Sequence, residues 1–227
     1  KNRASGVYFM WAADDDFFTK NYIESCVNYL EKNPQFLLAA GKAVYRRPDH
    51  SFYNGVNITL ESDDSTERVI KCFETAMDNG IFYGLYRRST LNRIDTGRHF
   101  LGNDWVILAE IAYLGKVKVI ENTSITRDAS HLFNDTPWKR IINLYGLPDF
   151  AVHTPWTWMA LETRFFLKRT PIIQKKSERK NLANIVYKIL QGRFIIKERK
   201  NASLFYYLLS LVYYPFFSWK NRTNKNL

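Results

Sequence analysis

The stretch SGVYFMWAADDDFFTKNYIE, residues 5–24, decides the fold, because it joins an apolar run, an acidic cluster and the start of a helix. Val7–Ala13 is rich in β-forming residues and ends at Asp14, so it predicts a buried strand that runs into an acidic loop. Thr19 is a suitable N-cap for a helix over Lys20–Lys32. The apolar face of this helix is expected to hold Tyr22, Ile23, Cys26, Val27 and Leu30.

Strands and helices continue to alternate at short spacing further along the chain. Ser65 or Thr66 can cap a second helix that ends before Gly80, and Asp104–Leu114 predicts a strongly apolar third helix before Gly115. The expected strands between and after these helices are Phe36–Ala40, Lys42–Tyr45, Ile81–Tyr86 and Val117–Ile120. The alternation predicts an α/β fold with a mostly parallel sheet flanked by helices.

The pattern changes after Ile120, where loops and helices replace the alternation. We expect helices at Trp138–Leu144, Trp156–Phe166 and Asn181–Leu190, the last two separated by a basic linker. The sequence therefore predicts an α/β domain over residues 1–166 and a basic helical tail over residues 167–227.

Composition and charge exclude some classes of protein. Among 227 residues, 46% are hydrophobic and 24% charged, as in folded proteins. The net charge of +11 belongs to the tail, since Arg164–Leu227 holds fifteen Lys and Arg against two acidic residues, and the remainder holds eighteen against twenty. Nucleic-acid binding by the folded part is therefore not expected. Cys26 and Cys72 fit core positions in a reducing compartment, which indicates a cytoplasmic location.

The segment of residues 202–219 carries no charge and is bracketed by basic residues. Tyrosines and leucines between basic flanks suit a membrane interface, so an anionic membrane surface is an expected partner and the inner face of the membrane an expected location. A packed core or partner helix and a true span, for which the segment is close to the lower length limit, remain alternatives.

The acidic cluster Asp14-Asp15-Asp16 predicts a cation site. Three carboxylates at the end of a buried strand repel one another unless a cation offsets their charge, and oxygen ligands suit Mg²⁺ or Mn²⁺. Ligand sites in α/β sheets also lie beyond the carboxyl ends of strands. The alternative is an acidic turn that caps the following helix.

Residues 5–24 closely resemble the acid motif of family 2 glycosyltransferases, which have the GT-A fold. The resemblance implies that Asp15 and Asp16 hold the metal that bridges a nucleotide diphosphate, with Phe18 as the following aromatic residue. The position two before Asp15 is Ala13 and not an acid, so Asp14 is the candidate to take part in that site in its place.

Two further segments continue this resemblance. GIFYGLYRRSTL, residues 80–91, resembles the strand and loop before the acceptor site, and GNDWVILAEIAYLGKVKVI, residues 102–120, resembles the segment in which an acid opens a helix. The resemblance implies that Asp104 is the catalytic base. Such a base deprotonates the acceptor hydroxyl in an inverting transfer. Taken without the resemblance, Asp104 is better explained as a helix N-cap.

The resemblance also suggests residues that contact the metal or the phosphates. His131, in RDASHLF at residues 127–133, lies where relatives carry a histidine near the metal or diphosphate. Arg87, Arg88 and Arg127 can contact phosphates or an acceptor. A surface histidine and structural arginines are the alternatives.

The resemblance covers about Ala4 to His131 and implies a transferase that moves a sugar from a nucleotide-linked donor, expected to be UDP-linked, to a glycan or lipid-linked acceptor in cell-surface polysaccharide synthesis. The chain opens almost at the acid motif, so an N-terminal nucleotide-binding portion of roughly 80 residues is expected to precede it. The alternatives are a noncatalytic membrane-associated module, an inactive transferase fragment and a metal-dependent phosphohydrolase.

Overall fold

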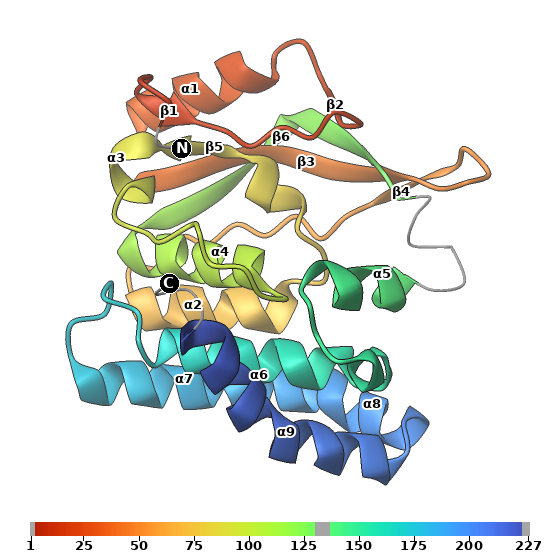
Figure 1. Cartoon of the computed structure of the whole chain (residues 1–227). Coiled ribbons are helices and arrows are strands. Elements are labelled where there is room, and N and C mark those ends of the chain that lie inside the picture. The colour runs from red at the N-terminus through yellow and green to blue at the C-terminus, as the bar shows by residue number, and fades with distance from the viewer. Residues whose placement is uncertain (1–2, 130–136, 224–227) are drawn as a thin grey trace. The chain divides into compact units, whose positions relative to one another are not determined.

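The computed structural model describes residues 3–129 and 137–223, which form two compact units (Figure 1). The first, which we name the sheet unit, comprises Lys1–Arg98, Asn103–Asp135 and Pro171–Lys175. The second, the helical unit, comprises His99–Gly102, Thr136–Thr170 and Lys176–Leu227. The expected boundary between residues 166 and 167 does not coincide with this division, because the helix before it packs against the helices that follow.

The sheet unit is built on one mixed sheet whose strands follow the order β1-β5-β3-β6-β2, with β4 paired to β3. Its elements are β1 (Tyr8–Phe9), β2 (Phe17–Phe18), α1 (Tyr22–Lys32), β3 (Phe36–Arg46), β4 (Phe52–Asn54), α2 (Ser65–Thr75), η1 (Gly80–Tyr83), β5 (Leu85–Arg87), α3 (Arg88–Leu91), α4 (Asn103–Leu114) and β6 (Lys116–Asp128). The α/β class is thus confirmed.

The expectation of a mostly parallel sheet is not confirmed. Among the described strands only β3 and β6 pair in parallel, while β1–β5, β2–β6, β3–β4 and β3–β5 pair antiparallel. Two of these antiparallel pairings involve β5, which follows the 3₁₀ helix η1 and runs back beside β3. The predicted strand Ile81–Tyr86 is therefore split between η1 and β5, because Gly84 ends the 3₁₀ turn.

The predicted buried strand Val7–Ala13 is wrong in length and burial. Only Tyr8 and Phe9 pair with β5, both are half-buried, and Val7 is 72% exposed. The apolar character of this run is used instead in ring contacts, since Trp11 stacks on Phe82 at 4.4 Å between ring centroids. This segment therefore leads into the acidic loop as an edge and not as a central strand.

Helix α1 covers one face of the sheet, and α4 followed by α2 lies on the other face (Figure 1). Tyr22, Cys26 and Leu30 of α1 are almost fully buried against β3, as their spacing predicts, while Ile23 is 54% exposed. Every residue from Trp105 to Ala112 of α4 is buried, which explains why this helix is apolar on all sides.

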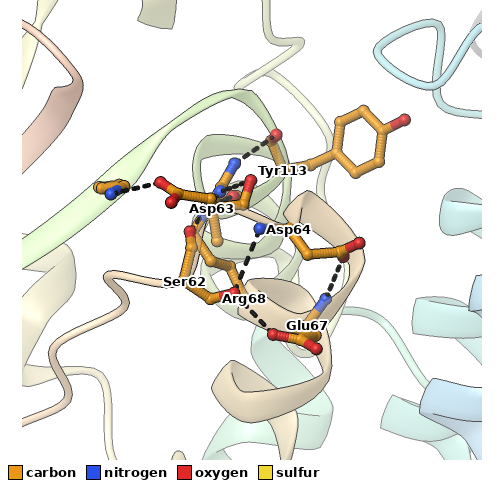
Figure 2. Close-up of polar contacts among 8 residues, drawn as sticks. Ser62, Asp63, Asp64, Glu67, Arg68 and Tyr113 are labelled. Atoms are coloured by element: carbon orange, nitrogen blue, oxygen red, sulfur yellow. Dashed lines mark hydrogen bonds and ion pairs between the residues drawn. The ribbon is translucent and has the colours of Figure 1, made fainter.

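Two buried arginines fix the position of α4. Arg68 of α2 donates to the carbonyls of Ala112 and Tyr113, at 2.6 Å and 3.0 Å, and also to the carbonyls of Ser62 and Asp63 (Figure 2). A cation at the C-terminal end of a helix satisfies its last carbonyls and complements the helix dipole. Arg98 and Glu110 form a second, bidentate ion pair inside the unit.

The loop that Arg68 holds also begins α2. Asp64 is the N-cap and accepts a hydrogen bond from the Glu67 N–H at 2.9 Å, so the cap lies one residue before the predicted Ser65 or Thr66 (Figure 2). Lys116, at the start of β6, pairs with Asp63 at 2.7 Å. The end of α4, the start of α2 and the start of β6 are thus tied together.

The helical unit consists of α5 (Pro137–Leu144), η3 (Asp149–His153), α6 (Pro155–Leu167), α7 (Lys176–Leu190), the π-helical η4 (Gln191–Ile195), α8 (Ile196–Asn201) and α9 (Leu204–Thr223). The helices predicted at Trp138–Leu144 and Trp156–Phe166 are confirmed, and the helix predicted at Asn181–Leu190 is present but begins at Lys176, inside the expected basic linker. Within the described ranges, no helix has both the length and the apolar character that crossing a bilayer requires.

A glycine in β3 allows α1 to pack closely on the sheet. A Cβ on Gly41 would lie 2.6 Å from a Tyr22 ring carbon and 2.8 Å from the Thr123 carbonyl oxygen. Gly41 also precedes a shift in the register between β3 and β6. We expect Gly41→Ala to lower the free energy of unfolding by about 1–3 kcal/mol through overpacking.

Urea denaturation followed by far-UV circular dichroism measures this effect. The matched control is Gly192→Ala in η4, where no atom lies within 4 Å of the added Cβ and a helix former should leave stability unchanged or higher by up to about 1 kcal/mol. Equal denaturation midpoints for Gly41→Ala and the unmodified chain would contradict the packing argument.

Candidate functional site

The acidic cluster lies in the loop between β1 and β2, and its three carboxylates differ in environment. Asp14 and Asp15 are exposed, whereas only 1% of the Asp16 side chain is accessible. Asp16 is therefore directed into the protein, and two neighbouring carboxylates remain at the surface. Their different exposure indicates that the three residues do not play the same part.

Arg127 of β6 neutralises the buried carboxylate. Its Nε lies 3.1 Å from Asp16 Oδ1, and the Arg127 side chain is 15% exposed. The guanidinium carbon lies 3.9 Å from the centre of the Tyr83 ring, which adds a cation–π contact. Arg127 is thus held on one side by a charge and on the other by an aromatic face.

The same guanidinium connects the acidic loop to the start of α4. Arg127 Nη1 donates to Asn79 Oδ1 at 2.6 Å, and the Asn79 side chain in turn acts on the Asp104 carboxylate, whose pKa it lowers. Asp104 further accepts a hydrogen bond from the Trp105 N–H at 3.0 Å. We name the chain Asp16–Arg127–Asn79–Asp104 the polar network; it joins the two carboxylates that the sequence singles out.

Burial raises the pKa of both carboxyls of the polar network above the ordinary range. For Asp16, desolvation outweighs the opposing Arg127 charge, and the charges of Asp15 and Asp14 raise its pKa further. For Asp104, desolvation outweighs the hydrogen bonds from Trp105 and Asn79 and the Arg127 charge. A carboxylate with a raised pKa is a stronger base than an exposed one, which suits proton abstraction at Asp104.

Arg87 and Arg88 lie outside the polar network and bind backbone carbonyls. Arg87 donates to the carbonyls of Phe36, at 2.9 Å, and Leu30, at the end of α1. Arg88 donates to the carbonyls of Ala4, Ser5 and Gly6. Both therefore follow the structural alternative in this chain, and neither is gathered with Arg127. His131 lies outside the described residues.

Within residues 3–129 and 137–223, no three His, Cys, Asp or Glu side chains converge as a complete metal-binding group. Magnesium ions in nucleotide sites usually keep several waters and bind one or two carboxylates together with substrate phosphates. Asp15, with Asp14 beside it, offers such a partial ligand set at the surface, and the chemistry of these donors fits Mg²⁺ or Mn²⁺.

Sequence reasoning missed Asn79 and Tyr83. Asn79 falls at the end of the predicted second helix and has the appearance of a turn residue, and Tyr83 falls inside the predicted strand. The available signal was the segment Asp78-Asn79-Gly80, where polar side chains precede a glycine with no room for a Cβ: one built there would lie 2.3 Å from Ala43 Cβ. Such close packing fixes η1, which positions Asn79.

No model of a known protein family matches the chain, and a search among curated proteins gives no match. The polar network therefore has to be interpreted from its own geometry together with the resemblance in the sequence.

The ion pair of the polar network generates a stability prediction. We expect Arg127→Met to lower the free energy of unfolding by about 3 kcal/mol at pH 7, because it leaves the buried Asp16 carboxylate without a counter-charge. Since protonation of Asp16 removes that charge, the loss should shrink as the pH falls through its raised pKa.

Chemical denaturation at several pH values measures the effect. Arg46→Met is the matched control on the neighbouring strand, because the Arg46–Asp128 pair is more exposed, at 38% and 26% of the side chains, and exposed pairs contribute about 1 kcal/mol or less. Equal losses for the two variants, or a loss at Arg127 that does not depend on pH, would show that the polar network does not have this electrostatic role.

Proposed function

We propose that the sheet unit belongs to a family 2 glycosyltransferase of the GT-A type, which moves a sugar from a UDP-linked donor to a glycan or lipid-linked acceptor with inversion, in cell-surface polysaccharide synthesis at the inner face of the membrane. One observation carries the proposal. Arg127 pairs with Asp16 of the acid motif and donates to Asn79, whose side chain lowers the pKa of Asp104, so the polar network links the acidic loop to the carboxylate at the start of α4.

The proposed roles follow from the different environments of the carboxylates. Asp15 and Asp14 are exposed and face solvent, so they are the ligands for a divalent cation held together with the donor diphosphate. When bound, that cation stabilises the negative charge of the departing diphosphate. Asp16 is paired with Arg127 and fixes the acidic loop on β6.

Asp104 is the proposed base. In an inverting transfer its carboxylate takes the proton of the acceptor hydroxyl while the hydroxyl oxygen forms the bond to the anomeric carbon and the bond to the diphosphate breaks. The partly buried carboxyl, with its raised pKa, retains an unshared pair for this proton. The Trp105 N–H orients it through a hydrogen bond.

The donor site can be tested with Mn²⁺, whose unpaired electrons broaden nearby NMR signals. With millimolar UDP present, we expect substoichiometric Mn²⁺ to broaden the amide signals of the acidic loop. In the Asp15→Asn variant we expect the apparent affinity for Mn²⁺, measured from this broadening, to be at least tenfold lower. The variant loses a charged oxygen ligand. Amide spectra of the isotope-labelled chain provide the measurement.

Glu74→Gln, which removes an exposed carboxylate from α2, is the matched control. Mn²⁺ should broaden the acidic-loop signals of this variant as strongly as those of the unmodified chain. The transferase proposal fails if Mn²⁺ does not broaden the signals of the acidic loop in the unmodified chain. It also fails if the broadening is equal in the unmodified chain and in Asp15→Asn. Release of inorganic phosphate from UDP would instead favour a phosphohydrolase.

The proposed base generates a separate prediction. We expect Asp104→Asn to keep the apparent affinity for Mn²⁺ in the presence of UDP within about twofold, since Asp104 is proposed to act on the acceptor and not on the donor. The rate at which the chain releases UDP from a UDP-sugar should fall by about 10²-fold or more. A coupled assay for UDP, run over a panel of UDP-sugars with water as acceptor, measures this release. A release rate that is unchanged in Asp104→Asn would remove Asp104 from the role of base.

A further inference from the structure

Helix α9 is attached to the helical unit by a polar contact at its centre. Ser210 is fully buried, its hydroxyl lies 2.7 Å from the Thr154 hydroxyl, and it accepts a hydrogen bond from the Trp158 indole at 3.1 Å. The same indole packs edge-on against the rings of Tyr214 and Phe217. The inner face of α9 is therefore specified by a serine and aromatic rings and is fixed on α6.

The outer face of α9 is apolar and exposed. Its side chains have exposed fractions between 50% and 68%, an inversion of the usual pattern in which the apolar face of a surface helix is buried. We name this set the α9 stripe: Leu204, Phe205, Leu208, Val212 and Phe216. Single exposed apolar residues are ordinary, but five on one side of one helix need a partner.

The exposed charges of α8, the helix that precedes α9, are of one sign. Lys197, Arg199 and Lys200, in the preceding helix α8, are all exposed. Glu198 is the sole acidic residue of the sequence between Arg179 and Leu227, and it is buried. It caps α6 instead, accepting from the backbone N–H groups of Trp156 and Thr157 at 2.7 Å and 2.9 Å. The described surface of α8 and α9 thus presents cations without exposed carboxylates.

We infer that the α9 stripe docks on the surface of an anionic lipid bilayer, with α9 lying in the interface plane and the α8 cations on the lipid headgroups. An apolar face beside basic residues binds such a surface through buried apolar area and attraction to anionic lipids. The exposed Tyr213 ring fits the interfacial region. A second copy of the chain is disfavoured as the occupant, because it would bring its own α8 cations to the contact.

The inference rests on the proposed location at the membrane and not on the transfer chemistry. It names the element that makes the contact and the lipid charge that it requires. Vesicle binding is measured without nucleotide or metal, so a failure of docking and a failure of the donor site give separate results.

The test is cosedimentation of the full chain with sucrose-loaded vesicles of phosphatidylcholine containing 30% phosphatidylglycerol, compared with phosphatidylcholine alone. We expect the anionic vesicles to bind at least tenfold more strongly, and raised salt to remove most of that difference. The variant Leu208→Glu/Val212→Glu should bind about tenfold or more weakly, because it places two charges in the α9 stripe.

Ile23→Glu, at a residue of α1 with a similar exposed fraction of 54%, is the matched control and should bind as the unmodified chain does. A second variant, Lys197→Gln/Arg199→Gln/Lys200→Gln, leaves the α9 stripe intact and should lose the preference for anionic vesicles by roughly tenfold or more. Circular dichroism spectra confirm that each variant is folded.

Three outcomes would overturn the inference. The first is a lack of binding to anionic vesicles at low salt, and the second is equal binding by Leu208→Glu/Val212→Glu and Ile23→Glu. The third is a dimer in sedimentation velocity that Leu208→Glu/Val212→Glu converts to a monomer, together with a lack of vesicle binding by both the dimer and the monomer. That result would assign the α9 stripe to contact with a second copy of the chain.

Discussion

The parallel pairing of β3 with β6 is the constraint on which the sheet unit depends. The two strands are the longest of the described sheet, and α1, β5 and β2 are arranged around them. Their register places Tyr45 opposite Arg127. Since β6 also pairs with β2 at the end of the acidic loop, one ladder determines where Arg127 meets Asp16. The Arg127–Asp16 pair of the polar network therefore follows from strand register, whereas Asn79 is positioned by η1.

Much of the fold could be predicted from local signals. The positions of α1, α4, α5 and α6 follow from apolar spacing, caps and the proline or glycine beyond each end. The same spacing correctly places Cys26 and Cys72 in the core. What the sequence could not supply is strand direction: whether β5 runs parallel or antiparallel to β3 depends on how η1 turns the chain, and a short apolar run has the same appearance in either direction.

The candidate site could be predicted only in part, for a related reason. Carboxylates at the ends of elements are visible in a sequence, so Asp16 and Asp104 were accessible to prediction. Arginines are harder to assign, because a guanidinium can bind a carboxylate or a set of backbone carbonyls with equal geometry. Arg127 meets a buried acid, whereas Arg87 completes the end of α1. Only tertiary contacts separate these two uses.

The two units use buried charge in different ways. In the sheet unit, the charges of Arg127 and Asp16 offset one another. Asp104 keeps a raised pKa, because desolvation outweighs the effect of the Arg127 charge. In the helical unit, the Glu198 carboxylate accepts hydrogen bonds from backbone N–H groups at the start of α6, where the helix dipole favours an anion. By directing its acid inward, α8 leaves Lys197 and Arg199 outward, so the cap of α6 and the positive surface of α8 have the same structural cause.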